Sequence, residues 1–357
     1  MSFKNQKIPK SLLTIPINSI SIGNMISRLL EKQIVDKLNA KKILIILGAR
    51  QVGKTTLIKS IKDKFFSKKK VLYLNCDLEE DRKTISTSSL IELKKLSDNV
   101  DLFIIDEAQR LDNPGLTLKI IHDNLDVEII ATGSSSFELK NKLSDTLTGR
   151  YLDFVLFPFS FEEVKSQIAN IEKLIIYGFY PEVFLLKKNE EKILLLNNIV
   201  DSYLFKDILS FQRIRHSQVL KDLLIAVAYQ IGSEINENEL SNRLKIDRKT
   251  IASYLDILEK TFIIKRLYPF SKNPRREIGR RYKIYFTDLG IRNALIGDFN
   301  DFNIRSDSGA IWENFIIIEK IKSSENKGVL KDFFFWRSYA GAEIDLIEKS
   351  KVTSKLS

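Results

Sequence analysis

The chain is poor in the residues and runs that mark secreted and membrane proteins. It has one cysteine, Cys76, which excludes a disulfide framework and fits a reducing cytoplasm. No apolar run approaches the roughly 18 residues of a membrane span. Pro16 and Asn18 interrupt the N-terminal segment where the core of a signal peptide would lie. We therefore expect a cytoplasmic protein without a membrane segment, in which residues 1–24 form a loose extension.

Prolines are also few, 7 in 357 residues, and the composition is that of a soluble globular protein, with 44% hydrophobic and 29% charged residues. At about 150 residues per domain, the length predicts more than one domain. Acidic residues are outnumbered: 46 Asp and Glu face 57 Lys and Arg, which gives a net charge of +11. This excess favours a polyanionic partner, either nucleic acid or a membrane surface, but it does not define the fold.

The most informative stretch is a glycine loop that follows a short apolar run. Residues 44–47 are apolar, as in a strand buried on both faces of a parallel sheet, and residues 48–55, GARQVGKT, fit G-x-x-x-x-G-K-[ST] at every fixed position. Backbone N–H groups of such a loop wrap a phosphate chain at a helix N-terminus. We predict that ATP binds here, with Lys54 on the β- and γ-phosphates and the Thr55 hydroxyl on Mg²⁺. The predicted nucleotide-binding residues are Gly48, Arg50, Gln51, Val52, Gly53, Lys54, Thr55 and Thr56.

A second apolar run, Leu102 to Ile105, ends in two acids, Asp106 and Glu107. Alone, such a pair is typical of a helix start. Downstream of a phosphate loop, it predicts that Asp106 holds Mg²⁺ and that Glu107 polarises the attacking water as a general base.

Two further candidates follow the third predicted strand, which ends near Gly133. We expect Ser134 to contact the γ-phosphate or to position the water, with Thr132 as the alternative; a serine at a strand end is otherwise an ordinary turn or cap. Arg150 precedes the next apolar strand, in a segment short enough to fold back over the nucleotide. It is predicted either as an arginine finger, acting in cis or from a neighbouring subunit, or as a surface arginine.

Several blocks together carry a family resemblance. GARQVGKTT, LFIIDEAQ, ATGSSSFEL, LTGRYLDFVLFPFSFEE, YGFYPEV and YLFKDI are similar to those of archaeal and bacterial AAA-type ATPases that have a nuclease-like C-terminal domain of unknown function. The resemblance covers the chain from about residue 25 onward. It implies the same roles for Lys54, Thr55, Asp106, Glu107, Ser134 and Arg150.

Helical periodicity marks the middle of the chain. The first helix closes at Gly232, and Asn236 and Asp247 are the predicted N-caps of the next two, the former with Glu239 in a capping box. Three helices followed by the β-like residues 262–270 are the layout of a winged helix-turn-helix. Such a module either contacts DNA or packs against protein.

Basic residues crowd the start of the last of these helices and the segment after residue 264, with Tyr268, Phe270 and Tyr282 among them. Basic residues interleaved with aromatic residues suit contact with nucleic-acid phosphates and stacking on nucleobases. Most runs of charged residues, however, are solvated loops. The predicted nucleic-acid-binding residues are Arg248, Lys249, Lys272, Arg275, Arg276, Arg280 and Arg281. The same basic stretch includes Lys265, Arg266 and Lys283.

The tail resembles the opening of the PD-(D/E)xK nuclease fold: a helix that bears Glu313, then two strands with Asp345 on the second. In that fold the next strand supplies E-x-K, a further metal ligand and a lysine that positions water. No such strand follows here, so the resemblance implies a degenerate site at Glu313 and Asp345 without its lysine. The alternative is that the carboxylates only cap a sheet, whose edge at residues 343–349 is open.

The combined expectation is an α/β fold: an ASCE/AAA-type P-loop parallel sheet with a helical lid, a winged helix-turn-helix and a partial PD-(D/E)xK-like domain. We predict an ATPase that uses Mg²⁺ and switches conformation in association with nucleic acid. The alternative is a nucleotide-controlled switch or scaffold for protein partners, and an ATP-dependent nuclease is disfavoured. Besides ATP, the sequence leaves DNA, a protein partner and a second copy of the chain open as partners. The expected units are 1–24, an extension; 25–160, the ATPase domain; 161–215, a helical lid or linker; 216–270, the winged helix; and 271–357, a truncated restriction-endonuclease-like domain.

Overall fold

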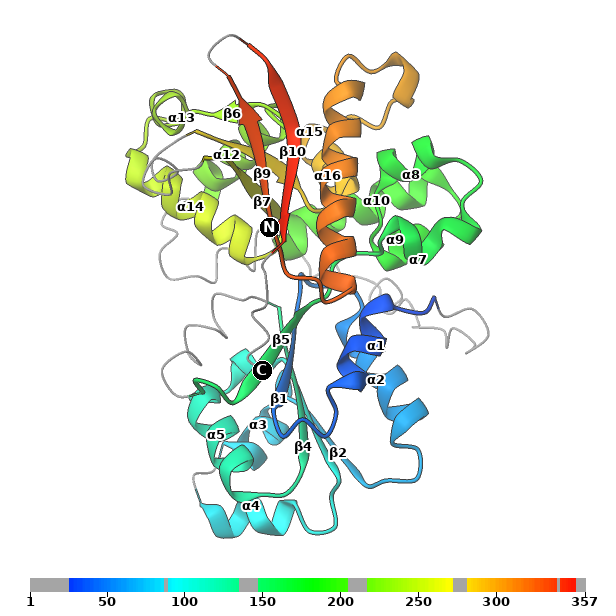
Figure 1. Cartoon of the computed structure of the whole chain (residues 1–357), viewed down its shortest axis with the longest axis vertical. Coiled ribbons are helices and arrows are strands. Elements are labelled where there is room, and N and C mark those ends of the chain that lie inside the picture. Colours follow the sequence, from blue (N-terminus) through cyan, green and yellow to red (C-terminus); the bar gives the residue numbers. More distant parts are fainter. Residues whose placement is uncertain are drawn as a thin grey trace, which may run out of the picture.

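The chain folds into two lobes, each with its own five-stranded sheet (Figure 1). The computed structural model describes residues 26–86, 89–134, 147–204, 217–271, 281–338 and 341–350. The described residues between 29 and 155 form the first lobe, and those between 161 and 350 form the second. None of the helices in these residues is long and apolar enough to span a bilayer.

Five strands form the first sheet: β1 (Ile43–Leu47), β2 (Val71–Asn75), β3 (Leu102–Asp106), β4 (Glu128–Gly133) and β5 (Tyr151–Val155). They run parallel in the order β2-β3-β4-β1-β5. Every residue of β1 and β3 is buried, as their unbroken apolar runs predict. The sheet confirms the predicted P-loop NTPase fold. Because its strands are parallel, the carboxyl ends of β1, β3 and β4 share one edge.

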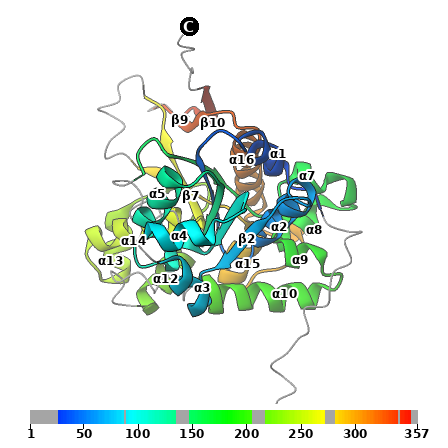
Figure 2. The same cartoon turned by 90° about the horizontal axis from the view of Figure 1, so that it is seen from below.

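Helices cover both faces of this sheet (Figure 2). On one face lie α1 (Leu29–Asp36) and α2 (Lys54–Phe65), and on the other α3 (Glu79–Ile85), α4 (Leu90–Leu96) and α5 (Pro114–Asn124). Successive strand residues point to opposite faces. Leu44 and Ile46 therefore pack in the core beneath α1 and α2, whereas Ile43 and Ile45 pack in the core of the other face. These two cores fix the strand ends from which the functional loops emerge.

A helical segment follows the first sheet, in the region predicted as a lid or linker. It contains α7 (Phe161–Val164), α8 (Ile171–Tyr177), α9 (Pro181–Leu185), α10 (Asn189–Asn198) and the π-helical η5 (Ile199–Leu204). Helices α8 and α10 pack against α15 (Leu289–Ile296) of the second lobe. The start of α9 also approaches the glycine loop, since a Cβ placed on Gly53 would lie 4.0 Å from the ring of Pro181. Short 3₁₀ turns occur at η3 (Ala108–Arg110), η4 (Lys165–Gln167) and η7 (Phe302–Ile304).

The second sheet joins two segments that the sequence assigns to separate domains. It contains β6 (Glu234–Ile235), β7 (Ile264–Pro269), β8 (Tyr282–Phe286), β9 (Lys331–Arg337) and β10 (Glu343–Ser350). The order is β10-β9-β7-β8-β6, with only β7 and β9 parallel. The tail strands β9 and β10 thus extend the sheet of β6, β7 and β8. The boundary predicted between residues 270 and 271 therefore falls inside one sheet.

Two helices of the second lobe start where their predicted caps lie. The helices that follow residue 216 are α12 (Ser217–Ala228), α13 (Glu237–Leu244), α14 (Arg248–Lys260), α15 and α16 (Ser308–Asn326). The Asn236 side chain accepts from the backbone N–H groups of Asn238 and Glu239, and Asp247 accepts from Lys249 N–H. Both N-caps are confirmed. The helix predicted to close at Gly232 ends at Ala228, and Gly232 follows it with φ +72°.

Strand β10 lies at the outer edge of the second sheet, as predicted for residues 343–349. Among the described residues, its backbone pairs with β9 alone, and most of its residues are exposed. Lys349 lies on this edge strand, while Lys351 is outside the described residues.

Candidate functional site: the phosphate loop and the strand ends beside it

The glycine loop connects β1 to α2 at the carboxyl edge of the first sheet. Gly53 has φ +96°, in the left-handed region that favours glycine. Gly48 has no room for a side chain, because a Cβ there would lie 2.2 Å from the carbonyl oxygen of Leu156. The two fixed glycines of the motif thus have distinct causes, a backbone turn at one end and a close approach of two strands at the other.

Lys54 begins α2 and turns its side chain back into this loop. It is 5% exposed, and its Nζ donates to the carbonyl oxygens of Gly48 and Ala49 at 2.9 and 3.0 Å. A cation held within a loop of backbone groups at a helix N-terminus suits a phosphate chain. Of the other predicted loop residues, Val52 is buried, Arg50, Gln51 and Thr55 are partly buried, and Thr56 is exposed.

The structure brings the two predicted magnesium ligands together. Thr55 Oγ1 donates to Asp106 Oδ2 at 2.9 Å, although 51 residues separate them in the chain. Asp106 is 3% exposed and also accepts from the hydroxyls of Tyr73 and Thr132. Burial, and then the hydrogen bond to Asp106, raise the pKa of Tyr73, so its hydroxyl stays a donor at neutral pH. Hydroxyl and carboxylate oxygens are the ligand types that Mg²⁺ prefers.

Glu107 follows β3 in a left-handed conformation, with φ 54° and ψ 44°. Its carboxylate accepts from the Gln109 side-chain amide, which also donates to Ser134 Oγ at 3.1 Å. Gln109 therefore joins the two predicted catalytic residues, from β3 and β4. Sequence reasoning missed Gln109, although it stands within the quoted DEAQ motif, because nothing in the motif shows that its amide turns back toward Glu107.

Thr132, the alternative to Ser134, has its hydroxyl committed to the protein. Its Oγ1 donates to Asp106 and accepts from the backbone N–H of Glu107 at 2.9 Å, and the residue is fully buried. Ser134 is partly exposed and lies just beyond β4. Of the two, Ser134 is thus the better placed to meet a ligand at this edge.

Arg150 lies at the opposite edge of the sheet. Its carbonyl oxygen accepts from the N–H of Ile43, the first residue of β1, whereas the phosphate loop follows Leu47, the last. At about 3.3 Å per residue, this places Arg150 roughly 15 Å from the loop along the strand direction. Its side chain pairs with Asp123 at 2.8 Å. The prediction that Arg150 folds over the nucleotide of its own chain is wrong, because parallel pairing of β5 with β1 sets the two at opposite strand ends.

We expect Arg150→Ala to change the ATP turnover of a dilute, monomeric sample by less than about threefold, because the side chain lies far from the loop of its own chain. Steady-state phosphate release over a range of protein concentrations measures this. A loss of ~10³-fold that persists on dilution would restore the arginine finger in cis. A loss that develops only at concentrations where the chain self-associates would assign the finger to a neighbouring subunit.

Arg28 is a buried neighbour of the loop that sequence reasoning missed. Its side chain is 8% exposed and its Nη1 donates to the carbonyl oxygen of Val52 at 2.8 Å. Its Nε pairs with Glu163 at 3.0 Å. Because Glu163 lies 135 residues away, no local pattern in the sequence reveals this contact.

The predicted degenerate site in the tail has a lysine after all. Lys283, on β8, is 3% exposed, and its Nζ lies 3.1 Å from Glu313, 2.7 Å from Glu343 and 3.3 Å from Asp345. The Tyr285 hydroxyl donates to Glu313 at 2.6 Å. The predicted acids Glu313 and Asp345 are therefore brought together, and the expectation of a cluster without lysine is wrong. This lysine lies on β8, an earlier strand, where the sequence pattern shows it only as one of the basic residues.

The charge on Lys283 is well supported. Burial alone lowers its pKa, but hydrogen bonds and Coulomb attraction from Glu343 and Glu313 outweigh burial and raise the pKa above its ordinary value. In return, the hydrogen bond from Lys283 lowers the pKa of Glu343. Among the described residues, no group of three or more His, Cys, Asp or Glu side chains is arranged to hold a metal ion.

Some members of the predicted basic stretch are thus not free to contact nucleic acid. Arg266 is largely buried and pairs with Glu259 at 2.6 Å, and Lys283 is enclosed by acids. Arg248, by contrast, is 58% exposed although it pairs with Glu237. Lys249 and Arg281 are exposed. Lys272, Arg275, Arg276 and Arg280 lie outside the described residues.

Lys283→Met is expected to lower the free energy of unfolding by about 2 kcal/mol at pH 7, because three carboxylates lose their buried cation. The partly exposed acids are screened by water, which keeps the effect below that of a fully buried pair. Lys283 lowers the pKa of Glu343, so its contribution is present above the ordinary glutamate pKa and is lost as pH falls through the lowered value. The difference between variant and wild type should therefore shrink below about pH 4. Urea unfolding at pH 7 and at about pH 3 measures it.

Lys331→Met is the matched control for this prediction. Lys331 of β9 pairs with Glu348 of β10, the strand that also carries Glu343 and Asp345. Both side chains of this control pair are more than a quarter exposed. Its loss should cost less than about 1 kcal/mol. Equal effects of the two substitutions at pH 7 would show that the Lys283 cluster is not a special stabilising contact.

Family models match successive parts of the chain. An AAA domain matches residues 40–165, a domain of unknown function (DUF8612) residues 168–301, and a second domain of unknown function (DUF4143) residues 308–354. The second match spans the boundary predicted at residue 270, in agreement with the shared sheet. The first match covers the sheet, the phosphate loop and the strand ends described above.

Two related proteins and one solved structure are similar to large parts of this chain. The chain is 26% identical over 289 residues to an uncharacterized protein of Haemophilus influenzae, which covers 74% of this chain and 72% of that protein. It is 27% identical over 322 residues to an uncharacterized protein of Methanocaldococcus jannaschii, and this match covers 82% of this chain and 69% of that protein. A solved structure, the Walker-type ATPase of Pyrococcus abyssi, is similar in fold, with a TM-score of 0.54 and 16% identity over 76% of this chain and 96% of that one. Residues 40–165 form an AAA-type P-loop domain, as the family match and the fold both indicate. This AAA domain is followed by domains of unknown function.

Proposed function

We propose that the chain hydrolyses ATP at the loop of residues 48–55. The observation that carries this proposal is the contact between Thr55 and Asp106, whose oxygens lie 2.9 Å apart beside the buried ammonium of Lys54. Thr55 and Asp106 would hold Mg²⁺, which neutralises phosphate charge when bound. Lys54 would contact the β- and γ-phosphates, and the backbone N–H groups of the loop would orient the phosphate chain.

Glu107 would accept the proton of the attacking water, and Ser134 would orient that water or the γ-phosphate. The left-handed backbone of Glu107 supports this role. Such a conformation in a residue other than glycine costs about 1–3 kcal/mol and persists where the surroundings impose it, often at functional sites. The Glu107 N–H held by Thr132 and the carboxylate held by Gln109 are the contacts that impose it here.

We further propose that nucleotide turnover drives a conformational switch in association with nucleic acid, through a winged helix-turn-helix over residues 217–286. The element order helix, strand, two helices and two strands supports this, with β8 between β6 and β7. Around the turn from α13 to α14, four basic side chains are exposed: Arg243, Lys245, Arg248 and Lys249. The competing function is a nucleotide-controlled switch for protein partners, in which this module packs against protein.

DNA binding measured across salt concentrations separates these two functions. Fluorescence anisotropy of labelled single- and double-stranded DNA, with Mg²⁺ and an ATP analogue, should show an affinity that falls steeply with salt as phosphate contacts release counterions. Replacing Arg248 and Lys249 by alanine should reduce the salt slope by about one per lost contact. Absence of binding at low salt, together with an ATPase rate that DNA does not change, would favour the protein switch.

We expect no metal-dependent DNA cleavage by the tail cluster. The Lys283 ammonium lies among Glu313, Glu343 and Asp345, where it would compete with a divalent cation for their oxygens. Incubation of linear, nicked and branched DNA with Mg²⁺ or Mn²⁺ tests this. Cleavage that disappears in Asp345→Ala would contradict it and would make Lys283 part of a working nuclease site.

A further inference from the structure

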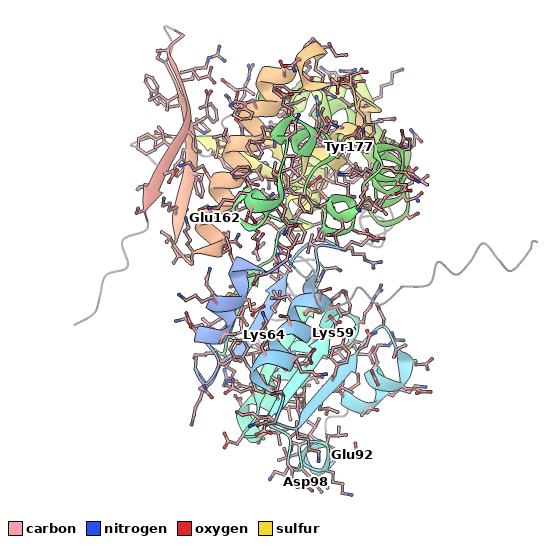
Figure 3. All side chains as sticks on the ribbon, turned by 90° about the vertical axis from the view of Figure 1, so that its right-hand side faces the viewer. Lys59, Lys64, Glu92, Asp98, Glu162 and Tyr177 are labelled. Atoms are coloured by element: carbon pink, nitrogen blue, oxygen red, sulfur yellow. The ribbon has the colours of Figure 1, made fainter. Side chains whose placement is uncertain are left out.

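The segment of residues 157–163 lies at the junction of the two lobes and is held by two largely buried ion pairs. It follows β5 and includes the start of α7, and Glu162 marks its place in Figure 3. One ion pair reaches it from the phosphate loop side and the other from α16 of the second lobe. The two pairs contact the segment in the same way, by one backbone carbonyl and one backbone N–H each.

Arg28 and Glu163 form the pair on the loop side. The guanidinium of Arg28 donates to Glu163 at 3.0 Å, to the carbonyl oxygen of Phe157 at 2.6 Å and to that of Val52 at 2.8 Å. It also lies 4.9 Å from the ring centroid of Phe159. The side chain of Glu163 is fully buried, and its second oxygen accepts from the backbone N–H of Ser160 at 2.7 Å. A planar guanidinium can hold three acceptors at fixed angles, which an ammonium on a flexible stem cannot do.

Lys322 and Glu319, both on α16, form the pair on the other side. Lys322 is 2% exposed at its side chain, and its Nζ donates to Glu319 and to the carbonyl oxygen of Phe159, both at 2.9 Å. Glu319 accepts from the backbone N–H of Phe161 at 2.6 Å. The ammonium lies 4.6 Å from the centroid of Phe179. Thus α16 is attached to the same short segment as Arg28, and both contact Phe159, Lys322 at its carbonyl oxygen and Arg28 at its ring.

These contacts form a continuous chain from the phosphate loop to α16. Val52 immediately precedes Gly53 and Lys54, the residues that would meet the phosphates. A shift of the Val52 carbonyl must therefore move or break its hydrogen bond to Arg28. Arg28 in turn donates to Phe157 and Glu163 of the junction segment. Because the protein interior is close-packed, such a displacement is transmitted to the neighbouring contacts and is not absorbed by the loop alone.

We propose that Arg28 is a positioning residue of the phosphate loop, and that the Arg28–Glu163 and Lys322–Glu319 pairs couple occupancy of the loop to the docking of α16. This proposal rests on nucleotide binding at the loop. Coupling between two sites is reciprocal: if nucleotide tightens α16, a change at α16 must alter nucleotide affinity by the same factor. A merely structural role of the two pairs predicts lower stability without this reciprocity.

The test combines hydrogen–deuterium exchange with calorimetric titration, using the full chain, Mg²⁺ and a non-hydrolysable ATP analogue. In the wild type, the analogue should slow exchange in residues 157–163 and in α16. In Arg28→Lys, which keeps the charge but loses the planar fork, the analogue should still bind, and the added protection of α16 should be lost. Glu319→Gln/Lys322→Met removes the second pair without leaving an uncompensated charge. This double variant should change affinity for the analogue by about fivefold or more, the lower range of measured couplings.

Lys64→Met is the matched control. Lys64 of α2 pairs with Glu31 of α1 at 2.7 Å, in the first lobe and away from the junction segment (Figure 3). It should leave both the affinity and the exchange of α16 unchanged. If the wild type does not bind the analogue, the proposed function fails and the coupling with it. If the wild type binds, but α16 exchange does not respond and the α16 double variant binds as wild type does, the coupling alone is wrong.

Discussion

Lys54→Ala is expected to weaken ATP binding by about 100-fold or more. The substitution removes the ammonium group that donates to the carbonyl oxygens of Gly48 and Ala49 in the loop, at 2.9 and 3.0 Å. A charge-assisted hydrogen bond contributes about 1.5–3 kcal/mol, and 1.4 kcal/mol is a factor of ten in affinity. The alanine variant loses such bonds to the phosphates, and it also loses the contacts that hold the two ends of the loop together.

Calorimetric titration with ATP and Mg²⁺ measures this effect. Lys59→Ala is the control, because Lys59 lies on the same helix with its side chain exposed (Figure 3). It removes the same charge from α2 without touching the loop and should leave the affinity within about twofold. Unchanged affinity in Lys54→Ala would refute the assignment of this loop to phosphate binding, whatever the control shows.

Glu107→Gln should retain ATP binding and lose turnover by about 10²–10⁴-fold, the usual contribution of a general base. The amide has the shape of the carboxylate, but it cannot accept the proton of water at neutral pH. Its carbonyl oxygen can still accept from Gln109, so the connection to Ser134 is preserved and the backbone has no new reason to leave its left-handed conformation.

Single-turnover hydrolysis, together with an affinity measurement on each variant, distinguishes lost chemistry from lost binding. Glu92→Gln makes the same chemical change on the exposed surface of α4, far from the loop (Figure 3). It should hydrolyse ATP at the wild-type rate. A Glu107→Gln rate within twofold of wild type would assign the base to another residue.

The parts of the fold that the sequence predicts best are those with local causes. The apolar runs at β1 and β3 favour burial on both faces, and the glycine loop has the residue spacing of a phosphate-binding loop between a strand and a helix. The caps at Asn236 and Asp247 are likewise local, because each side chain accepts from backbone N–H groups only two or three positions further along the chain. For these elements, the residues that decide the structure are neighbours in the chain.

The errors have non-local causes. Arg150 follows Ser134 of the predicted site by only 16 residues, but the register of β5 on β1 places it at the far end of the strands. Lys283 looks like one of several basic residues in the sequence. Only the folded chain shows that its side chain contacts Glu313 and Asp345, which lie 30 and 62 residues away. The domain boundary after residue 270 fails for the same reason, because β9 pairs with β7 across it. Long-range pairing leaves no mark within a window of a few residues.

The central claim is that this chain hydrolyses ATP with Mg²⁺, and steady-state phosphate release by the purified wild-type chain tests it most directly. We predict release that requires Mg²⁺, stops when the metal is chelated, and falls to background in Glu107→Gln. Release by wild type at the same background level as Glu107→Gln, with Mg²⁺ and saturating ATP and with or without DNA, would contradict the account.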